Sequence, residues 1–121
     1  MYLCIRIQYW VKLMIENYEV LFIEDSIIDA KYYMSLIREI HGKENLSITH
    51  VRKISTFEKL ASRKKFHLIL LDIHLHEYSG VETIKKVRDI EQRSPIIILT
   101  GDCDRKLASS ALMNGANDYL V

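Results

Sequence analysis

The sequence has little of the residues that cross-link or break a chain. It holds two cysteines, one proline and four glycines among 121 residues. Two cysteines provide no disulfide framework and favour a reducing compartment, which predicts a cytoplasmic protein. So few prolines and glycines exclude a low-complexity linker, and the length suits one domain with one core.

A strong charge of one sign and a long apolar run are also absent. A formal net charge of +1 gives no basic field for direct nucleic-acid binding. Arg6 and Lys12 interrupt the apolar N-terminal segment, which is too short for a membrane-spanning helix of about 20 residues and lacks the pattern of a signal peptide. We interpret residues 1–18 as an extension, a helix or strand that packs on the domain or docks a partner. Alternatively, the natural chain starts at Met14.

Three apolar runs, at residues 19–25, 67–72 and 96–100, each end in a polar side chain. Apolar runs of this length are typical of strands buried on both faces of a parallel sheet. The runs end in Glu24 and Asp25, in Asp72, and in Thr100. Since a buried carboxylate is costly unless a cation pairs with it, acids at the exits of buried strands indicate a site.

Apolar residues three and four positions apart predict a helix after each of these strands. Ser26, with Asp29 three residues later, is the expected N-cap of the first helix, which should end near His41. Ser55 and Ser79 are each followed by a glutamate at the third position, which predicts a capping box at the start of two further helices.

The last predicted helix follows the run that ends in Thr100. Asp102 or Asp104 is expected to cap its start, and Gly115 to end it. Residues 117–121 are then expected to begin a final strand.

Strands and helices alternate through residues 19–121, which predicts parallel strands joined by right-handed crossovers, with helices on both faces. Residues 46–54 mix β-branched and polar side chains, which suits an edge strand. The predicted fold is α/β: a doubly wound, five-stranded parallel sheet of order 2-1-3-4-5, the flavodoxin-like order. Its ligand site would lie at the carboxyl ends of strands 1 and 3, where the acids and the threonine meet.

Three carboxylates in one crevice repel each other and raise each other's pKa, which a divalent cation relieves. Oxygen-only ligands suit Mg²⁺, which can also hold phosphate oxygens during phosphoryl transfer. Asp72 would then be the nucleophile that becomes an acyl phosphate. The Thr100 hydroxyl could donate to a phosphoryl oxygen, and Gly101 would allow close approach.

These residues resemble the motifs of response regulator receiver domains, the CheY-like family. The resemblance covers roughly residues 19–121. It rests on Glu24-Asp25, on Asp72 with Gly80 eight residues later, on Thr100-Gly101, and on the sequence GANDYLV at residues 115–121. Each motif alone is weak, but together, in this order and on the predicted elements, they are specific.

The resemblance implies a role for each matching residue. Asp72 would be the phosphoacceptor, Asp25 the direct Mg²⁺ ligand, Glu24 a ligand through water, His74 a ligand through its backbone carbonyl, Thr100 the switch hydroxyl, and Tyr119 the aromatic that changes rotamer with it. It further implies self-catalysed transfer of a phosphoryl group from a sensor histidine kinase or phosphotransfer protein, followed by hydrolysis. A surface shift would pass the signal to an output domain beyond Val121, and a homodimer is left open.

Two departures from the family pattern stand out. The family usually has proline four residues after the phosphoacceptor, where this chain has His76. The family's lysine on the fifth strand would fall just after Val121, and the fifth helix would follow it. We therefore expect a fragment, truncated after strand 5, that binds Mg²⁺ but is phosphorylated poorly.

Alternative interpretations remain open at this point. The chain could be a receiver-like module that binds partners without phosphorylation. A phosphohydrolase with an aspartate nucleophile often has a second acid two residues on, where this chain has His74. His74 and His76 could together bind a transition metal, and Tyr119 could be a core residue only.

Overall fold

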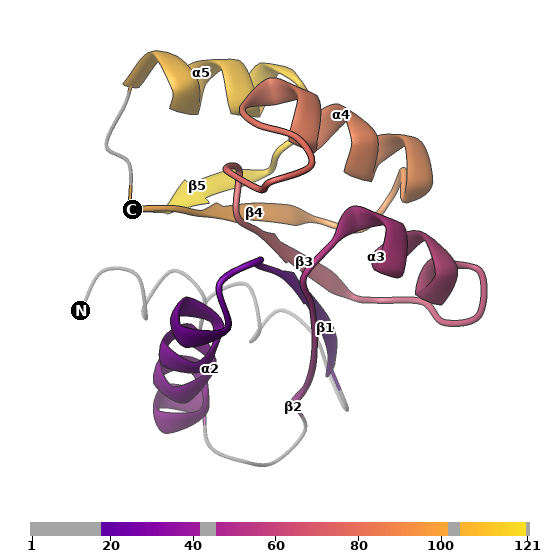
Figure 1. The fold of residues 1–121 in the computed structure, drawn as a ribbon, viewed down its shortest axis with the longest axis vertical. Coiled ribbons are helices and arrows are strands. Elements are labelled where there is room, and N and C mark those ends of the chain that lie inside the picture. Colours follow the sequence, from indigo (N-terminus) through magenta and orange to yellow (C-terminus); the bar gives the residue numbers. More distant parts are fainter. Residues whose placement is uncertain (1–17, 42–45, 102–104, 121) are drawn as a thin grey trace.

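The computed structural model describes residues 18–41, 46–101 and 105–120. Four helices and five strands alternate within these ranges (Figure 1). In chain order they are β1 (Tyr18–Ile23), α2 (Ile27–His41), β2 (Leu46–Val51), α3 (Ile54–Ala61), β3 (Leu68–Leu71), α4 (Val81–Ile90), β4 (Ile96–Leu99), α5 (Arg105–Met113) and β5 (Asp118–Leu120). The strands form one sheet of order β2-β1-β3-β4-β5, and every neighbouring pair is parallel. The predicted fold class and strand order are confirmed.

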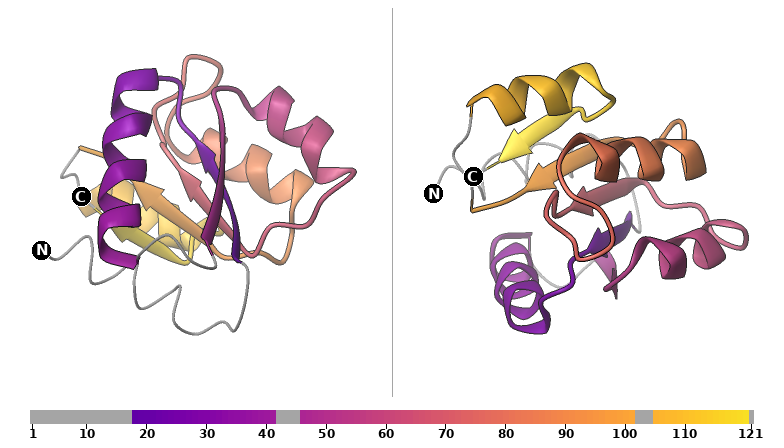
Figure 2. Two further views of the ribbon diagram at one scale, coloured as in Figure 1. Left: turned by 90° about the horizontal axis from the view of Figure 1, so that it is seen from below. Right: turned by 45° about the horizontal axis from the view of Figure 1, so that its top comes forward.

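Helices cover both faces of this sheet. Figures 1 and 2 show α2 on one face and α3, α4 and α5 on the other. Every residue of β3 and β4 is therefore buried, as continuous apolar strands require. The lower burial of β2 matches its place at the edge of the sheet, as its mixed sequence predicted.

Alternate side chains of each strand enter one of two apolar cores. Strand β1 sends Leu21 and Ile23 toward the helices α3–α5, and Val20 and Phe22 toward α2. This alternation follows from the two-residue period of a strand. Strands β1 and β3 lie side by side in the middle of the sheet and run in the same direction, so both end at the same end of the sheet.

The three caps predicted at serine residues have different outcomes. Ser26 does cap α2, because its Oγ accepts the Asp29 backbone N–H at 3.2 Å. The prediction of a capping box at Ser55 is wrong. Helix α3 already begins at Ile54, and the residue at the cap position, Lys53, makes no side-chain capping bond. The carboxylate of Glu77 instead accepts the Ile54 N–H at 2.7 Å, so a distant loop satisfies the start of this helix.

The Ser79 capping box is also wrong. Gly80, with a φ of +65°, precedes α4, and no side chain caps this helix. The Ser79 hydroxyl instead lies 3.2 Å from Nδ1 of His74. The prediction for Asp102 or Asp104 and that for residues 1–17 of the extension lie outside the described residues. Tyr18, the last residue of the predicted extension, is instead the first residue of β1.

Gly115 closes α5 as predicted. The Ala116 N–H donates to the carbonyl of Ala111 at 3.0 Å, the six-to-one bond of a Schellman motif, and Gly115 has a φ of +118°. The Arg88 side chain runs beneath this turn and donates to the Gly115 carbonyl at 2.9 Å and to Asn117 Oδ1 at 2.7 Å. A Cβ on Gly115 would lie 2.8 Å from Arg88 Cγ.

We expect Gly115→Ala to lower the free energy of unfolding by at least about 2 kcal/mol, because it adds a steric clash to the strain of a positive φ. Gly80→Ala is the comparison variant, since its φ is also positive but an added Cβ would meet no atom within 4 Å. Its loss should come from backbone strain alone, about 1–3 kcal/mol, and should be smaller than that of Gly115→Ala. Urea unfolding of both variants tests this difference, and equal losses would show that the Arg88 contact is easily relieved.

No helix among the described residues is long and apolar enough to cross a membrane.

Candidate functional site

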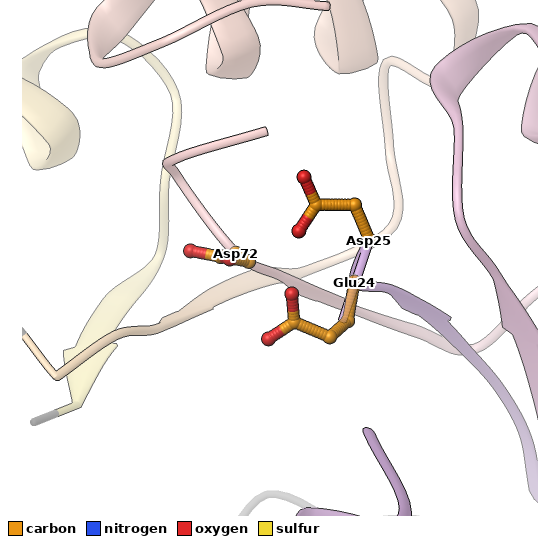
Figure 3. A group of neighbouring side chains, drawn as sticks. All are labelled: Glu24, Asp25 and Asp72. Atoms are coloured by element: carbon orange, nitrogen blue, oxygen red, sulfur yellow. The ribbon is translucent and has the colours of Figure 1, made fainter. Parts of the chain in front are cut away.

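Three carboxylates meet where β1 and β3 leave the sheet. Glu24 and Asp25 follow β1, Asp72 follows β3, and one ligand oxygen from each lies within 4.8 Å of the others (Figure 3). The parallel pairing of Ile23 with Leu71 causes this meeting, because it brings the next residues out of the sheet side by side. The Asp72 N–H still donates to the Ile23 carbonyl at 3.0 Å, so the pairing persists to the site.

Glu24 is the most buried of the three acids, with 4% of its surface exposed. Burial raises the pKa of its carboxyl from 4.5 to about 8, and a hydrogen bond with Asp72 and the charge of Asp72 act in the same direction. The Ser26 N–H, which donates to Glu24 Oε2 at 3.2 Å, opposes the rise. In the absence of a cation, the negative charges of the three carboxylates are therefore not fully compensated.

This raised pKa predicts how stability depends on pH in the absence of divalent metal. Between pH 4.5 and about 8 the folded chain holds a proton on Glu24 that the unfolded chain releases. The free energy of unfolding should therefore fall as pH rises through this range. Urea unfolding in a chelator measures it, and Glu24→Gln, which does not titrate, should flatten the slope. An unchanged slope in the Gln variant would contradict the assignment.

The end of β2 and the residue after it hold the backbone at the exit of β1. His50 Nε2 donates to the Glu24 carbonyl at 2.7 Å, and Arg52 Nε donates to the Asp25 carbonyl at 2.9 Å. Neither residue was expected at the site from the sequence. The sequence does place both residues at the carboxyl end of a strand. That position points to the site only when this strand is known to lie beside β1.

The loop after β3 contacts the acids from the other side. The His74 N–H donates to Asp72 Oδ1 at 3.0 Å, and the His76 N–H donates to Asp25 Oδ2 at 3.1 Å. The His76 ring contacts this Asp25 oxygen through Nδ1, whereas the His74 ring lies against Ser79. The two imidazoles thus have different partners. In residues 18–41, 46–101 and 105–120, the side chains grouped closely enough to share a metal are the three carboxylates.

Thr100 directly follows β4, and Tyr119 lies in the neighbouring strand β5. Thr100 is buried at the end of β4, and its N–H donates to the Leu120 carbonyl at 3.1 Å. Gly101 follows it and is exposed. Tyr119 lies opposite Ile98 in the sheet and packs, half-buried, against the core beneath α3–α5. Thr100 is therefore at the same end of the sheet as the acids, while Tyr119 contributes to the core.

The donor set suits a hard divalent cation. It consists of carboxylate oxygens, which Mg²⁺ prefers. A cation would offset the burial and the Asp72 charge, which both raise the pKa of Glu24. Nitrogen and sulfur ligands, which favour zinc or copper, do not belong to this group among the described residues.

The chain belongs to the response regulator receiver domain family, whose model matches residues 20–121. It is 29% identical over 106 residues to the transcriptional regulatory protein ZraR of Klebsiella oxytoca, an alignment that covers 88% of this chain and 23% of that protein. The chain therefore spans about a quarter of the length of that relative. This family membership confirms the resemblance that the motifs indicated.

Two solved structures extend the comparison. One is the receiver domain of the sensor histidine kinase PA1611 from Pseudomonas aeruginosa PAO1, with a magnesium ion coordinated in its active site cleft; identity is 26%, the TM-score 0.69, and coverage 87% of this chain and 84% of that one. The other is the receiver domain of Ssk1 from Saccharomyces cerevisiae, in a complex with the histidine phosphotransfer protein Ypd1. The identity to this structure is 26% and the TM-score is 0.69, and the match covers 88% of this chain and 79% of that one.

Proposed function

We propose that this chain is a phosphoacceptor receiver domain that takes a phosphoryl group onto Asp72 in an Mg²⁺-dependent reaction. The observation that carries the proposal is the group of three carboxylates within 4.8 Å at the carboxyl ends of β1 and β3. Membership of the receiver family and the magnesium ion in the PA1611 receiver support it. Because all three acids are present, we do not favour the alternative, a receiver-like module that binds partners without phosphorylation.

Asp72 would both hold the metal and react, whereas the other acids and His74 would hold the metal only. Asp25 and Asp72 would bind Mg²⁺ directly, Glu24 through water, and His74 through its backbone carbonyl. When bound, Mg²⁺ supplies positive charge to the oxygens of the phosphoryl group. A carboxylate oxygen of Asp72 would attack phosphorus while the bond from phosphorus to the donor breaks. The His74 N–H, which donates to Asp72 Oδ1, holds this carboxylate in place.

Thr100 and Gly101 receive the transferred group in this scheme. The Thr100 hydroxyl donates to a phosphoryl oxygen, and Gly101, which has no side chain, lets the group approach the backbone. Tyr119 follows the movement of Thr100 from the adjacent strand. Because Tyr119 packs against the core beneath α3–α5, a change of its rotamer would alter the surface of α5 and β5.

The phosphoryl donor is a sensor histidine kinase or a phosphotransfer protein. The complex of the Ssk1 receiver with Ypd1 supports the second class of donor. Helix α2 begins two residues after Asp25 and exposes Ile28 and Tyr32. Because exposed apolar side chains near the site favour protein binding, we propose that the donor binds to the first turns of α2. We further propose that the receiver runs to residue 121 and includes Tyr18, the first residue of β1, and that the residues before Tyr18 form an extension. We also propose that an output domain completes a cytoplasmic protein.

The experiment that tests this function is the binding of beryllofluoride, which mimics a phosphoryl group, followed by ¹⁹F NMR. We expect bound fluoride resonances only when Mg²⁺ is present. Asp25→Asn should abolish them, because it removes a charged ligand of the metal. Asp29→Asn, which neutralises an exposed acid in the first turn of α2, is the control and should bind as the unaltered chain does. Bound resonances without Mg²⁺ would sink the proposal.

A further inference from the structure

His76 makes two contacts to one oxygen of Asp25. Its backbone N–H donates to Oδ2 at 3.1 Å, and Nδ1 of its ring lies against the same atom. Asp25 is mostly buried, with 16% of its side chain exposed, whereas 91% of the His76 side chain faces solvent. His76 therefore holds Asp25 from the open side of the site.

The loop that carries His76 has supports of its own. The Leu75 N–H donates to the Tyr78 carbonyl at 3.1 Å, and the Gly80 N–H donates to the Ile73 carbonyl at 3.0 Å. The Thr83 hydroxyl also donates to the Ile73 carbonyl at 3.0 Å. These bonds place residue 76 at the tip of the loop whether or not its side chain is present, so the two contacts to Asp25 are additional to those that form the loop.

Neither contact could be made by the residue usual at this position. Proline has no backbone N–H and no side-chain donor. The departure from the family pattern at residue 76 therefore adds two hydrogen-bond donors at the edge of the carboxylate group. Both are directed at the acid that we expect to bind the metal directly.

We propose that His76 is a positioning residue for Mg²⁺, which fixes the Asp25 carboxylate in the orientation that the metal needs. Figure 3 shows one oxygen of Asp25 turned toward Glu24 and Asp72 and the other turned away. Because His76 uses only Oδ2, the second oxygen is left for the metal. Groups that orient metal ligands in this way raise metal affinity without touching the ion. This inference rests on the proposed function.

The test is the Mg²⁺ affinity of the full chain, measured by calorimetry. His76→Ala removes the ring contact and should weaken Mg²⁺ binding about tenfold, the lower end of the range for residues that orient metal ligands. His76→Asn, whose amide can donate to Oδ2, should restore most of this loss. His76→Pro, which removes both donors, should bind more weakly than the Ala variant. His67→Gln is the control, because His67 lies at the opposite end of β3 and contacts Glu19.

Two further measurements separate positioning from a general loss of structure. The metal-free His76→Ala variant should unfold at the same temperature as the unaltered chain. In the unaltered chain, the His76 ring resonances should shift when Mg²⁺ is added, and those of His67 should not. Equal or tighter Mg²⁺ binding by the Ala variant overturns the inference. Failure of the unaltered chain to bind Mg²⁺ overturns the proposed function as well.

Discussion

Asp72→Asn is expected to abolish phosphoryl uptake while the domain stays folded. Asparagine has nearly the same shape as aspartate, but its amide is not a nucleophile that can form an acyl phosphate. The substitution also removes the negative charge that helps to raise the pKa of Glu24. The variant should therefore be at least as stable as the unaltered chain when metal is absent.

The measurement is the intact mass of the protein after incubation with acetyl phosphate and Mg²⁺, with urea unfolding to confirm that the variant is folded. Asp89→Asn is the matched control, since Asp89 is an exposed acid on α4, away from the three carboxylates. The control should take up the phosphoryl group as the unaltered chain does. If Asp72→Asn still gains the group in full, Asp72 is not the acceptor.

The second large effect concerns the strand that delivers Glu24 and Asp25. Phe22 is fully buried in β1, and its ring packs edge-on against Tyr33 and at a tilt against His50. Phe22→Ala should lower the free energy of unfolding by about 3–5 kcal/mol, because it removes a large side chain and leaves a cavity. For a domain with a total stability of about 5–15 kcal/mol, that loss could unfold a large share of the molecules.

Urea unfolding measures this loss, and two controls set its scale. Phe22→Leu preserves much of the volume and should cost less than about 2 kcal/mol. Met113→Ala changes an exposed side chain at the end of α5 and should alter stability by no more than about 0.5 kcal/mol. A loss for Phe22→Ala as small as that for Met113→Ala would show that β1 does not depend on this core.

The fold could be predicted because its elements are encoded locally. Strands β3 and β4 contain apolar residues only, and β1 has a single charged residue, Glu19, near its start, so these three strands were predicted to be central. The mixed sequence of β2 placed it at the edge. The meeting of the three acids could also be predicted, because the carboxyl ends of parallel strands lie at the same side of a sheet.

The helix starts could not be predicted as well, because tertiary contacts decide them. Serine followed by glutamate at the third position is a local pattern, yet Glu77 satisfies the start of α3 and Gly80 sets the entry to α4. The contact between His76 and Asp25 spans 51 residues in sequence. No local pattern reports such a pairing, and only the meeting of the two loops reveals it.

The most direct test of the account is to locate the phosphoryl group in the protein. The chain would be incubated with acetyl phosphate, with and without Mg²⁺, reduced with borohydride to trap an acyl phosphate, digested, and mapped by mass spectrometry. We predict that the trapped product lies at Asp72 and forms only with Mg²⁺. A product at another residue, or the same yield without the metal, would contradict the account.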